Sequence, residues 1–185
     1  MSVVAVPEFL RQETSDFFDH VALLISRILT LWAQTVVETG NMRGDSTRIL
    51  AAGLAITGGT LYSIDIDSVD GKPWYPHFHD QYPQHQFLTS DSRTVPWERP
   101  IDLLLLDSDH HYDHVLAELK HLGPFVRHGG YLLVHDSGHE SGDALGDRRS
   151  LGTHVLDAIQ DYTRPLKLSW HHHHGRWGMA EIPIP

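Results

Sequence analysis

The sequence contains no cysteine among its 185 residues. This excludes disulfides and thiolate metal sites, so any metal ion must be held by oxygen or imidazole ligands. Long hydrophobic runs are also missing: VALLISRILTLWA is interrupted by Arg27 and is shorter than the roughly 20 residues that cross a bilayer. No basic segment precedes it, so neither a signal peptide nor a membrane partner is expected. Together these absences fit a cytoplasmic protein.

Positive charge is scarce as well. Fourteen Lys and Arg face 24 Asp and Glu, which gives a formal net charge of −10 with histidines neutral. A nucleic-acid-binding face needs clustered basic residues, so no nucleic-acid partner is expected and a small molecule is favoured. A chain of this length fits one domain with a substantial core. Residues 1–185 are therefore interpreted as one domain, in which residues 1–34 form a lead-in and a covering helix.

Strand-like and helix-like segments alternate along the chain, which predicts an α/β fold with a doubly wound, mainly parallel sheet and helices on both faces. The last two strands are joined by a short turn near Gly175 and must be antiparallel, which makes seven strands with an antiparallel edge pair. Helices are expected at 14–32, with a cap at residues 14–16, and at 44–59. Two more are expected at 110–127, where Gly123-Pro124 should break the last turn, and at 151–162. Strands are expected at 35–40, 60–67, 85–91, 101–107, 129–137, 166–173 and 177–184.

The stretch IDLLLLDSDHHYDH, residues 101–114, organises the rest. Its four leucines predict a strand buried on both faces, and the strand ends at a group of acids and histidines. In open α/β sheets, ligands bind outside the carboxyl ends of the strands, so the candidates for metal binding and catalysis are Asp107, Asp109, His110 and His111. A polar turn with Asp109 as a helix cap is the simpler alternative. It explains less readily why three acids and three histidines fall within eight residues.

The next buried strand ends in VHDS, residues 134–137. Adjacent strand ends bring Asp107 and Asp136 together, and two carboxylates with waters suit a hard cation such as Mg2+. Either His135 or Ser137 would complete the shell. Strand alternation points His135 and Asp136 to opposite faces, so both can be ligands only if the strand has ended. Asp136 and Ser137 are favoured for this reason, with His135 as the lesser candidate.

The segment VVETGNMRGDST, residues 36–47, predicts an anion-binding turn. A glycine after a buried strand lets the backbone approach a ligand, and the following helix supplies N–H donors. Gly40 and Gly44 are equally explained by a tight strand-to-helix turn. Asp65, at the end of the second strand, favours the ligand, because a carboxylate there suits ribose hydroxyls.

These residues together resemble class I S-adenosylmethionine-dependent methyltransferases over about residues 30 to 185. The pattern E-x-G-x-x-x-G-x-S matches at Glu38, Gly40, Gly44 and Ser46, and D-x-D-H-x-Y with H-D-[ST] matches after the fourth and fifth strands. The similarity is greatest to metal-dependent small-molecule O-methyltransferases, which include the catechol and macrolide-sugar enzymes. The resemblance implies a Rossmann-like fold, S-adenosylmethionine as cofactor and a divalent metal ion, with Mg2+ favoured.

The resemblance also implies roles for individual residues. The methionine moiety would lie against Gly40, Asn41 and Ser46, the ribose against Asp65, and the adenine edge against residues 90–92. The full set implied to bind the cofactor is Glu38, Gly40, Asn41, Gly44, Ser46, Asp65, Ser90, Asp91 and Ser92. Catechol-type relatives use a lysine after the fourth strand as base, and this chain has none there. In the sugar enzymes the positions matching Asp109 or His110 serve, and His110 is preferred because imidazole titrates near working pH.

The expected function is S-adenosylmethionine-dependent, metal-assisted O-methyl transfer to a hydroxyl of a sugar, phenol or polyketide-type small molecule. Two alternatives stay open: a metal-dependent phosphoesterase, since residues 109–111 spell DHH, and a non-catalytic cofactor-binding domain. A nicotinamide enzyme is disfavoured because the G-x-G-x-x-G spacing is absent. Homo-oligomerisation is left open as a source of further pocket walls.

Two segments have two interpretations each, and a third has one. Residues 171–174 are four consecutive histidines that either form a hairpin turn or chelate a transition metal, and the turn is favoured. The aromatic loop at 68–85 either lines the acceptor pocket or packs upon itself. Residues 138–150, rich in Gly, Asp and Arg, are expected to form a mobile surface segment beside the site.

Overall fold

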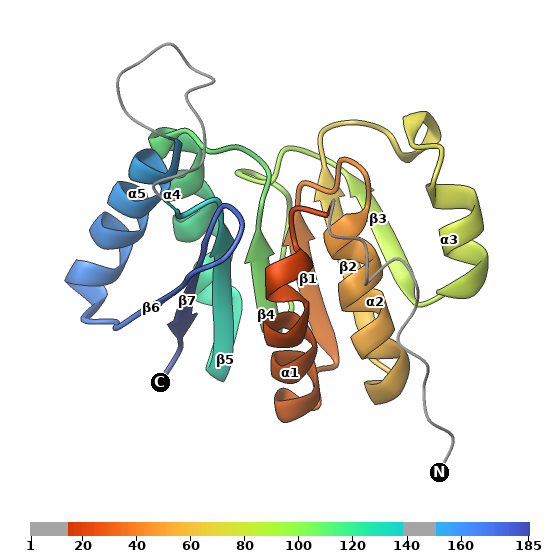
Figure 1. Ribbon diagram of the computed structural model, residues 1–185, viewed down its shortest axis with the longest axis horizontal. Coiled ribbons are helices and arrows are strands. Elements are labelled where there is room, and N and C mark those ends of the chain that lie inside the picture. The colour runs from red at the N-terminus through yellow and green to blue at the C-terminus, as the bar shows by residue number, and fades with distance from the viewer. Residues whose placement is uncertain (1–14, 139–150) are drawn as a thin grey trace.

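The computed structural model describes residues 15–138 and 151–185, and one seven-stranded sheet runs through it (Figure 1). The strand order is β3-β2-β1-β4-β5-β7-β6. The expected lead-in at 1–13 and all but the first residue of the expected mobile segment at 138–150 lie outside the described residues. The class of fold predicted from the sequence is confirmed: a doubly wound, Rossmann-like α/β sheet.

Five parallel strands form most of the sheet, and an antiparallel pair forms one edge. Strand β7 pairs antiparallel with both β5 and β6, as the short connection between the last two strands requires. The strands are β1 Thr35–Thr39, β2 Thr60–Asp65, β3 His85–Thr89, β4 Ile101–Leu106, β5 Val126–His135, β6 His171–His173 and β7 Met179–Pro183.

Helices cover both faces of this sheet. One layer contains α1 Val21–Leu31, α2 Asp45–Thr57 and α3 Tyr75–Gln81, and the other contains α4 Tyr112–Leu122 and α5 Leu151–Leu166. Short 3-10 helices occur at η2 Phe18–His20, η3 Val69–Gly71 and η4 Gly123–Phe125. No helix of the described part of the chain is long and apolar enough to span a membrane.

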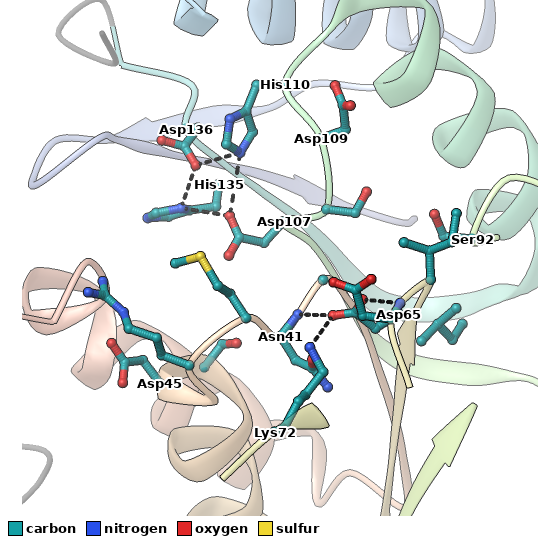
Figure 2. Close-up of a pocket in the computed structure, with 18 of the residues that line it drawn as sticks. Asn41, Asp45, Asp65, Lys72, Ser92, Asp107, Asp109, His110, His135 and Asp136 are labelled. Atoms are coloured by element: carbon teal, nitrogen blue, oxygen red, sulfur yellow. Dashed lines mark hydrogen bonds and ion pairs between the residues drawn. The ribbon is translucent and has the colours of Figure 1, made fainter. Parts of the chain in front are cut away.

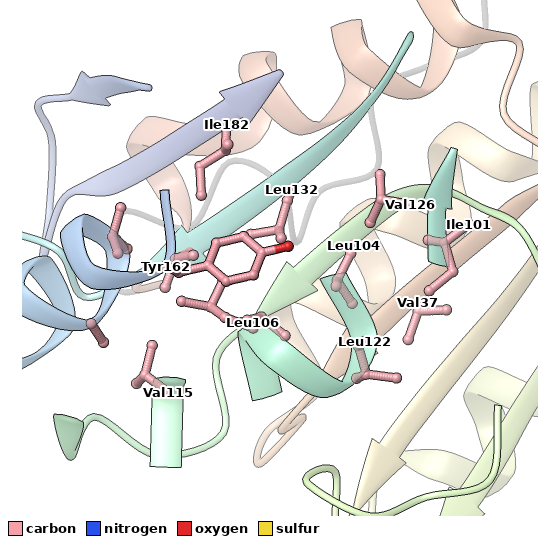
Figure 3. Close-up of a cluster of buried hydrophobic side chains, with 14 of the residues drawn as sticks. Val37, Ile101, Leu104, Leu106, Val115, Leu122, Val126, Leu132, Tyr162 and Ile182 are labelled. Carbon is pink, nitrogen blue, oxygen red and sulfur yellow. The ribbon is translucent and has the colours of Figure 1, made fainter. Parts of the chain in front are cut away.

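Strand β4 supplies both hydrophobic layers, because successive side chains point to opposite faces. Leu103 and Leu105 pack toward α1 and α2, whereas Leu104 and Leu106 pack toward α4 and α5. Figure 3 shows the second layer, where Tyr162 of α5 lies among aliphatic side chains of the sheet. All four leucines are at most 2% exposed, so the prediction of a strand buried on both faces is confirmed.

The predicted boundaries differ from the observed ones where the chain changes direction. The predicted first helix includes Trp32, but Trp32 adopts a left-handed conformation (φ 47°), which ends α1 at Leu31 and leaves its side chain 61% exposed. The proposed cap at residues 14–16 does not cap α1, which follows directly on η2. The break predicted at Gly123-Pro124 is confirmed, since α4 ends at Leu122.

The four consecutive histidines do not form a turn. Three of them make up β6, and only His174 lies in the connection to β7. The ladder with β7 places His173 Nε2 2.6 Å from Glu181 Oε2. The strand predicted at 166–173 is therefore confirmed for residues 171–173, where pairing with β7 overrides the polar character of the segment. The interpretation as a hairpin turn is wrong for these three residues.

Candidate active site at the carboxyl ends of the strands

A cleft of about 1210 Å³ opens at the carboxyl ends of the parallel strands. The loops after β1, β2, β3, β4 and β5 line it, as expected for ligand binding in an open α/β sheet. Twelve of the fifteen residues singled out in the sequence line this one cleft. They are Gly40, Asn41, Ser46, Asp65, Ser90, Asp91, Ser92, Asp107, Asp109, His110, His135 and Asp136.

The turn after β1 packs tightly against the end of β4. Gly40 adopts φ 73°, and its N–H donates to the carbonyl of Ile64 over 2.9 Å. A Cβ at this position would come within 3.0 Å of backbone atoms of Asp107 and Ser108. Only glycine suits both the left-handed conformation and this close approach. The turn and the Asp107 strand end are therefore held together by backbone contacts.

Asn41 presents an unsatisfied amide to the cleft. The residue is 4% exposed, yet neither its side-chain oxygen nor its side-chain nitrogen has a hydrogen-bond partner among the described residues. Buried polar groups are nearly always paired, so an orphaned amide lining a cleft marks a place for a polar ligand group. Its backbone N–H donates to Asp65 Oδ2 over 3.1 Å, which joins the turn after β1 to the end of β2.

The carboxylate of Asp65 is held by three donors. Besides Asn41, Lys72 Nζ lies 3.0 Å from Oδ2, and the N–H of Asp67 donates to Oδ1 over 2.9 Å (Figure 2). Lys72 is only 8% exposed and lines the same cleft. The sequence analysis does not identify Lys72, because a lysine in an aperiodic, proline-rich loop gives no positional signal.

Three residues after β3 form the far wall of the cleft. The N–H of Ser90 donates to the carbonyl of Asp65 over 2.9 Å, which fixes this loop beside the end of β2. Ser92 is 5% exposed. Hydrogen bonds from the Arg93 side chain and backbone lower the pKa of Asp91 to about 2, so this carboxylate is charged in the ordinary pH range.

Glu38 lies beneath the cleft rather than in its lining. Its side chain is fully buried on β1 and accepts hydrogen bonds from the hydroxyls of Ser46 (2.8 Å), Thr47 (2.6 Å) and Ser63. Burial raises the pKa of Glu38 to about 7, although the three hydroxyl donors oppose the rise. The carboxylate ties β1 to α2 and β2, so the predicted direct contact with a cofactor has no support in this arrangement.

Gly44 and Ser137 also lie outside the cleft lining. Gly44 caps α2 in a left-handed conformation (φ 74°), and a Cβ there would meet the Trp74 ring. Ser137 is fully buried, and its hydroxyl has no hydrogen-bond partner in the part of the chain that the structure describes. Both residues lie in the loops that surround the site, but neither lines the cleft.

Two acids and two histidines meet at the ends of β4 and β5 (Figure 2). His135 Nδ1 lies 2.9 Å from Asp107 Oδ1 and 3.0 Å from Asp136 Oδ2. His110 Nε2 lies 2.9 Å from the same oxygen of Asp136 and 3.9 Å from that of Asp107. We call these four residues the Asp-His cluster. Three of them, Asp107, His110 and Asp136, offer ligand atoms within 4.8 Å of one another.

The end of β5 explains how two consecutive residues reach one site. The strand ends at His135, and Asp136 adopts a left-handed conformation (φ 56°). Aspartate tolerates this conformation better than most residues. The alternation that would send the two side chains to opposite faces is thus interrupted, so the condition under which both can be ligands is met.

The cluster stabilises opposite charges. Burial lowers the pKa values of His110 and His135, but the hydrogen bonds and charges of Asp107 and Asp136 outweigh it and raise both to about 10. Burial likewise raises the pKa of Asp136, yet the two histidines outweigh it and lower it well below its usual range. Without a bound cation, both rings are therefore protonated, and their positive charges balance the two carboxylates.

Asp109 faces the cleft outside the Asp-His cluster. Its Oδ1 accepts from the backbone N–H of His111 over 2.7 Å and lies 2.6 Å from His111 Nδ1. Burial raises the pKa of Asp109, but these contacts to His111 outweigh it, and the net pKa is lowered. Asp109 thus turns its carboxylate back onto its own loop, as a capping residue does, and also lines the cleft.

The N-terminal segment closes one side of the cluster. The Phe17 ring stacks on His135 with centroids 4.2 Å apart and an interplanar angle of 20°. His20 approaches the same ring edge-on at 5.6 Å. Sequence reasoning misses both contacts, since they join residues more than 110 positions apart and hydrophobic periodicity assigns Phe17 only to a helix face.

The aromatic loop packs upon itself. Trp74, Tyr75 and Phe78 form edge-on ring pairs around α3, and His85 lies against Phe78. None of these rings is among the residues that line the cleft within the described part of the chain. Of the two readings of this loop, internal packing is the one that the structure supports.

Comparisons with known proteins agree on one family. Residues 37–137 match the family described as "Methyltransferase domain". A rhamnosyl O-methyltransferase of Mycobacterium leprae is 29% identical over 173 residues, which covers 87% of this chain and 70% of that protein. A rhamnosyl O-methyltransferase of Mycobacterium tuberculosis is 58% identical over 33 residues, which covers 18% of this chain and 14% of that protein.

Solved structures show the same fold at low sequence identity. The SAH-bound Podospora anserina methyltransferase has a TM-score of 0.70 at 13% identity and covers 97% of this chain and 89% of its own. The Bacillus cereus O-methyltransferase, solved in complex with SAH, has a TM-score of 0.66 at 14% identity and covers 97% and 93%.

Proposed function

The chain belongs to the methyltransferase domain family, and we propose that it transfers a methyl group from S-adenosylmethionine to a hydroxyl of a small molecule with the help of a divalent cation. The family match and the fold confirm the class I S-adenosylmethionine-dependent methyltransferase predicted from the sequence. The acceptor, the cation and the roles of individual residues are proposals.

One observation carries the proposal: a polar cradle and a cation-type cluster open into the same cleft. The cradle consists of the Gly40 turn, the unpaired amide of Asn41 and the carboxylate of Asp65. An amino-acid group can bind at the Asn41 amide. Ribose hydroxyls can bind at Asp65, since carboxylates accept hydrogen bonds from such hydroxyls in this fold. We assign the cofactor to this cradle and the acceptor to the space between it and the Asp-His cluster.

The Asp-His cluster fits a bound cation. Two carboxylates and two imidazole nitrogens meet there (Figure 2), and both Asp and His are known metal ligands. A cation there would lower the pKa of an acceptor hydroxyl and so favour its attack on the methyl group. Asp107, His110, His135 and Asp136 would hold it.

We assign proton acceptance from the acceptor hydroxyl to Asp109 rather than to His110. His110 Nε2 already faces Asp136 at 2.9 Å, so it is committed to the cluster. Asp109 lines the cleft with a carboxylate that uses one oxygen for His111. We do not favour the phosphoesterase alternative, because we assign two of the DHH residues to separate roles: Asp109 as the proton acceptor and His110 as a metal ligand.

The acceptor class rests on the curated relatives. Their names specify rhamnosyl groups, so we propose a sugar hydroxyl as the acceptor. The cleft is large enough for cofactor and acceptor together, since ligand sites commonly measure about 300–1,000 Å³.

Calorimetry tests the cofactor assignment. Asp65→Asn keeps the side-chain shape but removes the negative charge, and we expect S-adenosylmethionine to bind at least about tenfold more weakly, a loss of about 1.4 kcal/mol. The control is Asp70→Asn, which makes the same change on an exposed residue of the same loop outside the cleft lining. Equal binding by both variants would contradict the assignment. Transfer of labelled methyl groups to rhamnosides and catechols then tests the acceptor class.

A further inference from the structure

Two imidazole rings enter the Asp-His cluster from different elements. His110 precedes α4 and His135 ends β5, and both nitrogens face Asp107 Oδ1 and Asp136 Oδ2. The four contacts close into a ring of alternating carboxylate and imidazole groups (Figure 2). Two imidazole nitrogens therefore stand beside the two carboxylate oxygens at this site.

The His135 ring is held in place before any ligand arrives. It is 2% exposed, it stacks on Phe17, and its Nδ1 points to the two carboxylates. Its Nε2 is buried and has no hydrogen-bond partner among the residues described. Coordination of a cation would therefore use Nδ1, the nitrogen that lies against the two carboxylates. Replacing this ring by a water molecule as a ligand would cost free energy, because the stacking on Phe17 and the contacts with the two carboxylates would be lost.

This donor set does not fit Mg2+ well. Mg2+ prefers six oxygen ligands in a near-ideal octahedron and keeps several waters. Imidazole nitrogen instead suits Fe2+, Co2+, Ni2+ and Zn2+, and affinity for mixed nitrogen and oxygen sites rises across the first-row transition metals. Two carboxylates without histidines would have supported the expectation of Mg2+. A buried histidine, His135, and a half-buried one, His110, favour a transition-metal ion instead.

We propose that the Asp-His cluster selects a first-row transition-metal ion such as Fe2+, Co2+, Ni2+ or Zn2+ over Mg2+. The proposal rests on the proposed function only in that a divalent cation occupies this cluster. It differs from the sequence-based preference for Mg2+, which considered the carboxylates and treated His135 as the lesser ligand and His110 as a base.

The test compares metal affinities of the full chain, produced without an affinity tag and freed of metal by a chelator that is then removed. The exposed His171 and His174 are first changed to Gln, because the run of histidines would otherwise bind metal nonspecifically. Calorimetry with Co2+, Zn2+ and Mg2+ measures each Kd, and the visible absorption of Co2+ reports nitrogen ligation. We expect one site with Kd for Co2+ and Zn2+ at least about tenfold below that for Mg2+.

Two variants connect the preference to the cluster. His135→Asp replaces one imidazole by a carboxylate, and we expect the Co2+-to-Mg2+ preference to shrink at least about tenfold. Asp136→Asn keeps a residue that tolerates the left-handed conformation but removes one anionic ligand, and Co2+ binding at the site should be lost. Circular dichroism verifies that each variant is folded. A variant that fails to fold is replaced by His110→Gln, for which the same smaller preference is expected.

Two results would overturn the inference: Mg2+ binding at least as tightly as Co2+, or Co2+ binding that Asp136→Asn leaves unchanged. S-adenosylmethionine binding, titrated on the same samples, keeps this failure separate from failure of the proposed function. A chain that binds the cofactor but prefers Mg2+ contradicts only the metal selection. A chain that binds no cofactor contradicts the proposed function, whatever its metal affinities.

Discussion

Replacing Glu38 by Gln should make the protein more stable at neutral pH than at acid pH, relative to the unsubstituted chain. Glu38 is fully buried, and the hydroxyls of Ser46, Thr47 and Ser63 donate to its carboxylate. Burial raises the pKa of Glu38 from 4.5 to about 7 despite these donors. The glutamine amide has nearly the same shape: its oxygen can accept from Thr47 and Ser63, and its NH2 group can donate to the Ser46 oxygen once that hydroxyl rotates. The substitution therefore mainly removes the charge.

The magnitude follows from linkage between proton binding and folding. Because the pKa of Glu38 is higher in the folded protein, the unfolded chain releases this proton first as pH rises. The folded state therefore loses stability between pH 4.5 and about 7, and the loss is constant above that range. At 1.36 kcal/mol per pH unit, the rise from 4.5 to about 7 corresponds to roughly 3 kcal/mol.

Urea unfolding between pH 4 and pH 8.5 measures this effect. The free energy of unfolding of Glu38→Gln minus that of the unsubstituted protein should rise by about 3 kcal/mol up to neutral pH and then stay constant. The exposed Glu98→Gln controls for the general effect of removing one carboxyl group. A difference that is independent of pH, or that falls as pH rises, would refute the reasoning that burial dominates the environment of Glu38.

Three further predictions concern the packing of the site and its chemistry. Gly40→Ala forces a Cβ within 3.0 Å of the β4 exit in a left-handed conformation, so thermal denaturation should show a loss of about 2 kcal/mol or more and calorimetry no cofactor binding. Leu104→Ala removes a fully buried side chain and should cost about 2–5 kcal/mol in urea unfolding. Asp109→Asn should keep cofactor binding but reduce labelled methyl transfer about 100-fold or more, and transfer at the original rate would exclude Asp109 as the base.

The alternation of strands and helices predicted most of the fold, because the physical signals are local. The run of four leucines in β4 and the glycines that flank α2 each mark an element by residue types that can be recognised within a few positions of the sequence. The element boundaries that were predicted wrongly depend on contacts between residues far apart in the sequence. The strand predicted at 166–173 is shortened to 171–173, because only these residues pair with β7 and α5 continues to Leu166.

The same difference between local signals and distant contacts explains which parts of the site could be predicted. Strand ends meet at one edge of a parallel sheet, so Asp107 and Asp136 could be placed together from the sequence alone. The role of Glu38 could not be predicted from the sequence, although its motif was recognised. The register of β1 with β2 sets Glu38 opposite Ser63, and that hydroxyl, with Ser46 and Thr47, turns the carboxylate away from the cleft. A motif fixes the position of a residue along the chain but not the direction of its hydrogen bonds.

The separation of His110 from Asp109 has a consequence for catalysis. Consecutive residues after β4 point to different parts of the cleft: His110 to the Asp-His cluster, and Asp109 to its own loop at His111. A histidine that coordinates a cation through Nε2 has no lone pair left on that atom for a substrate proton. A carboxylate that uses one oxygen for His111 retains a second oxygen as an acceptor. One short loop can therefore supply both a metal ligand and a base, and the two functions do not compete for the same atom.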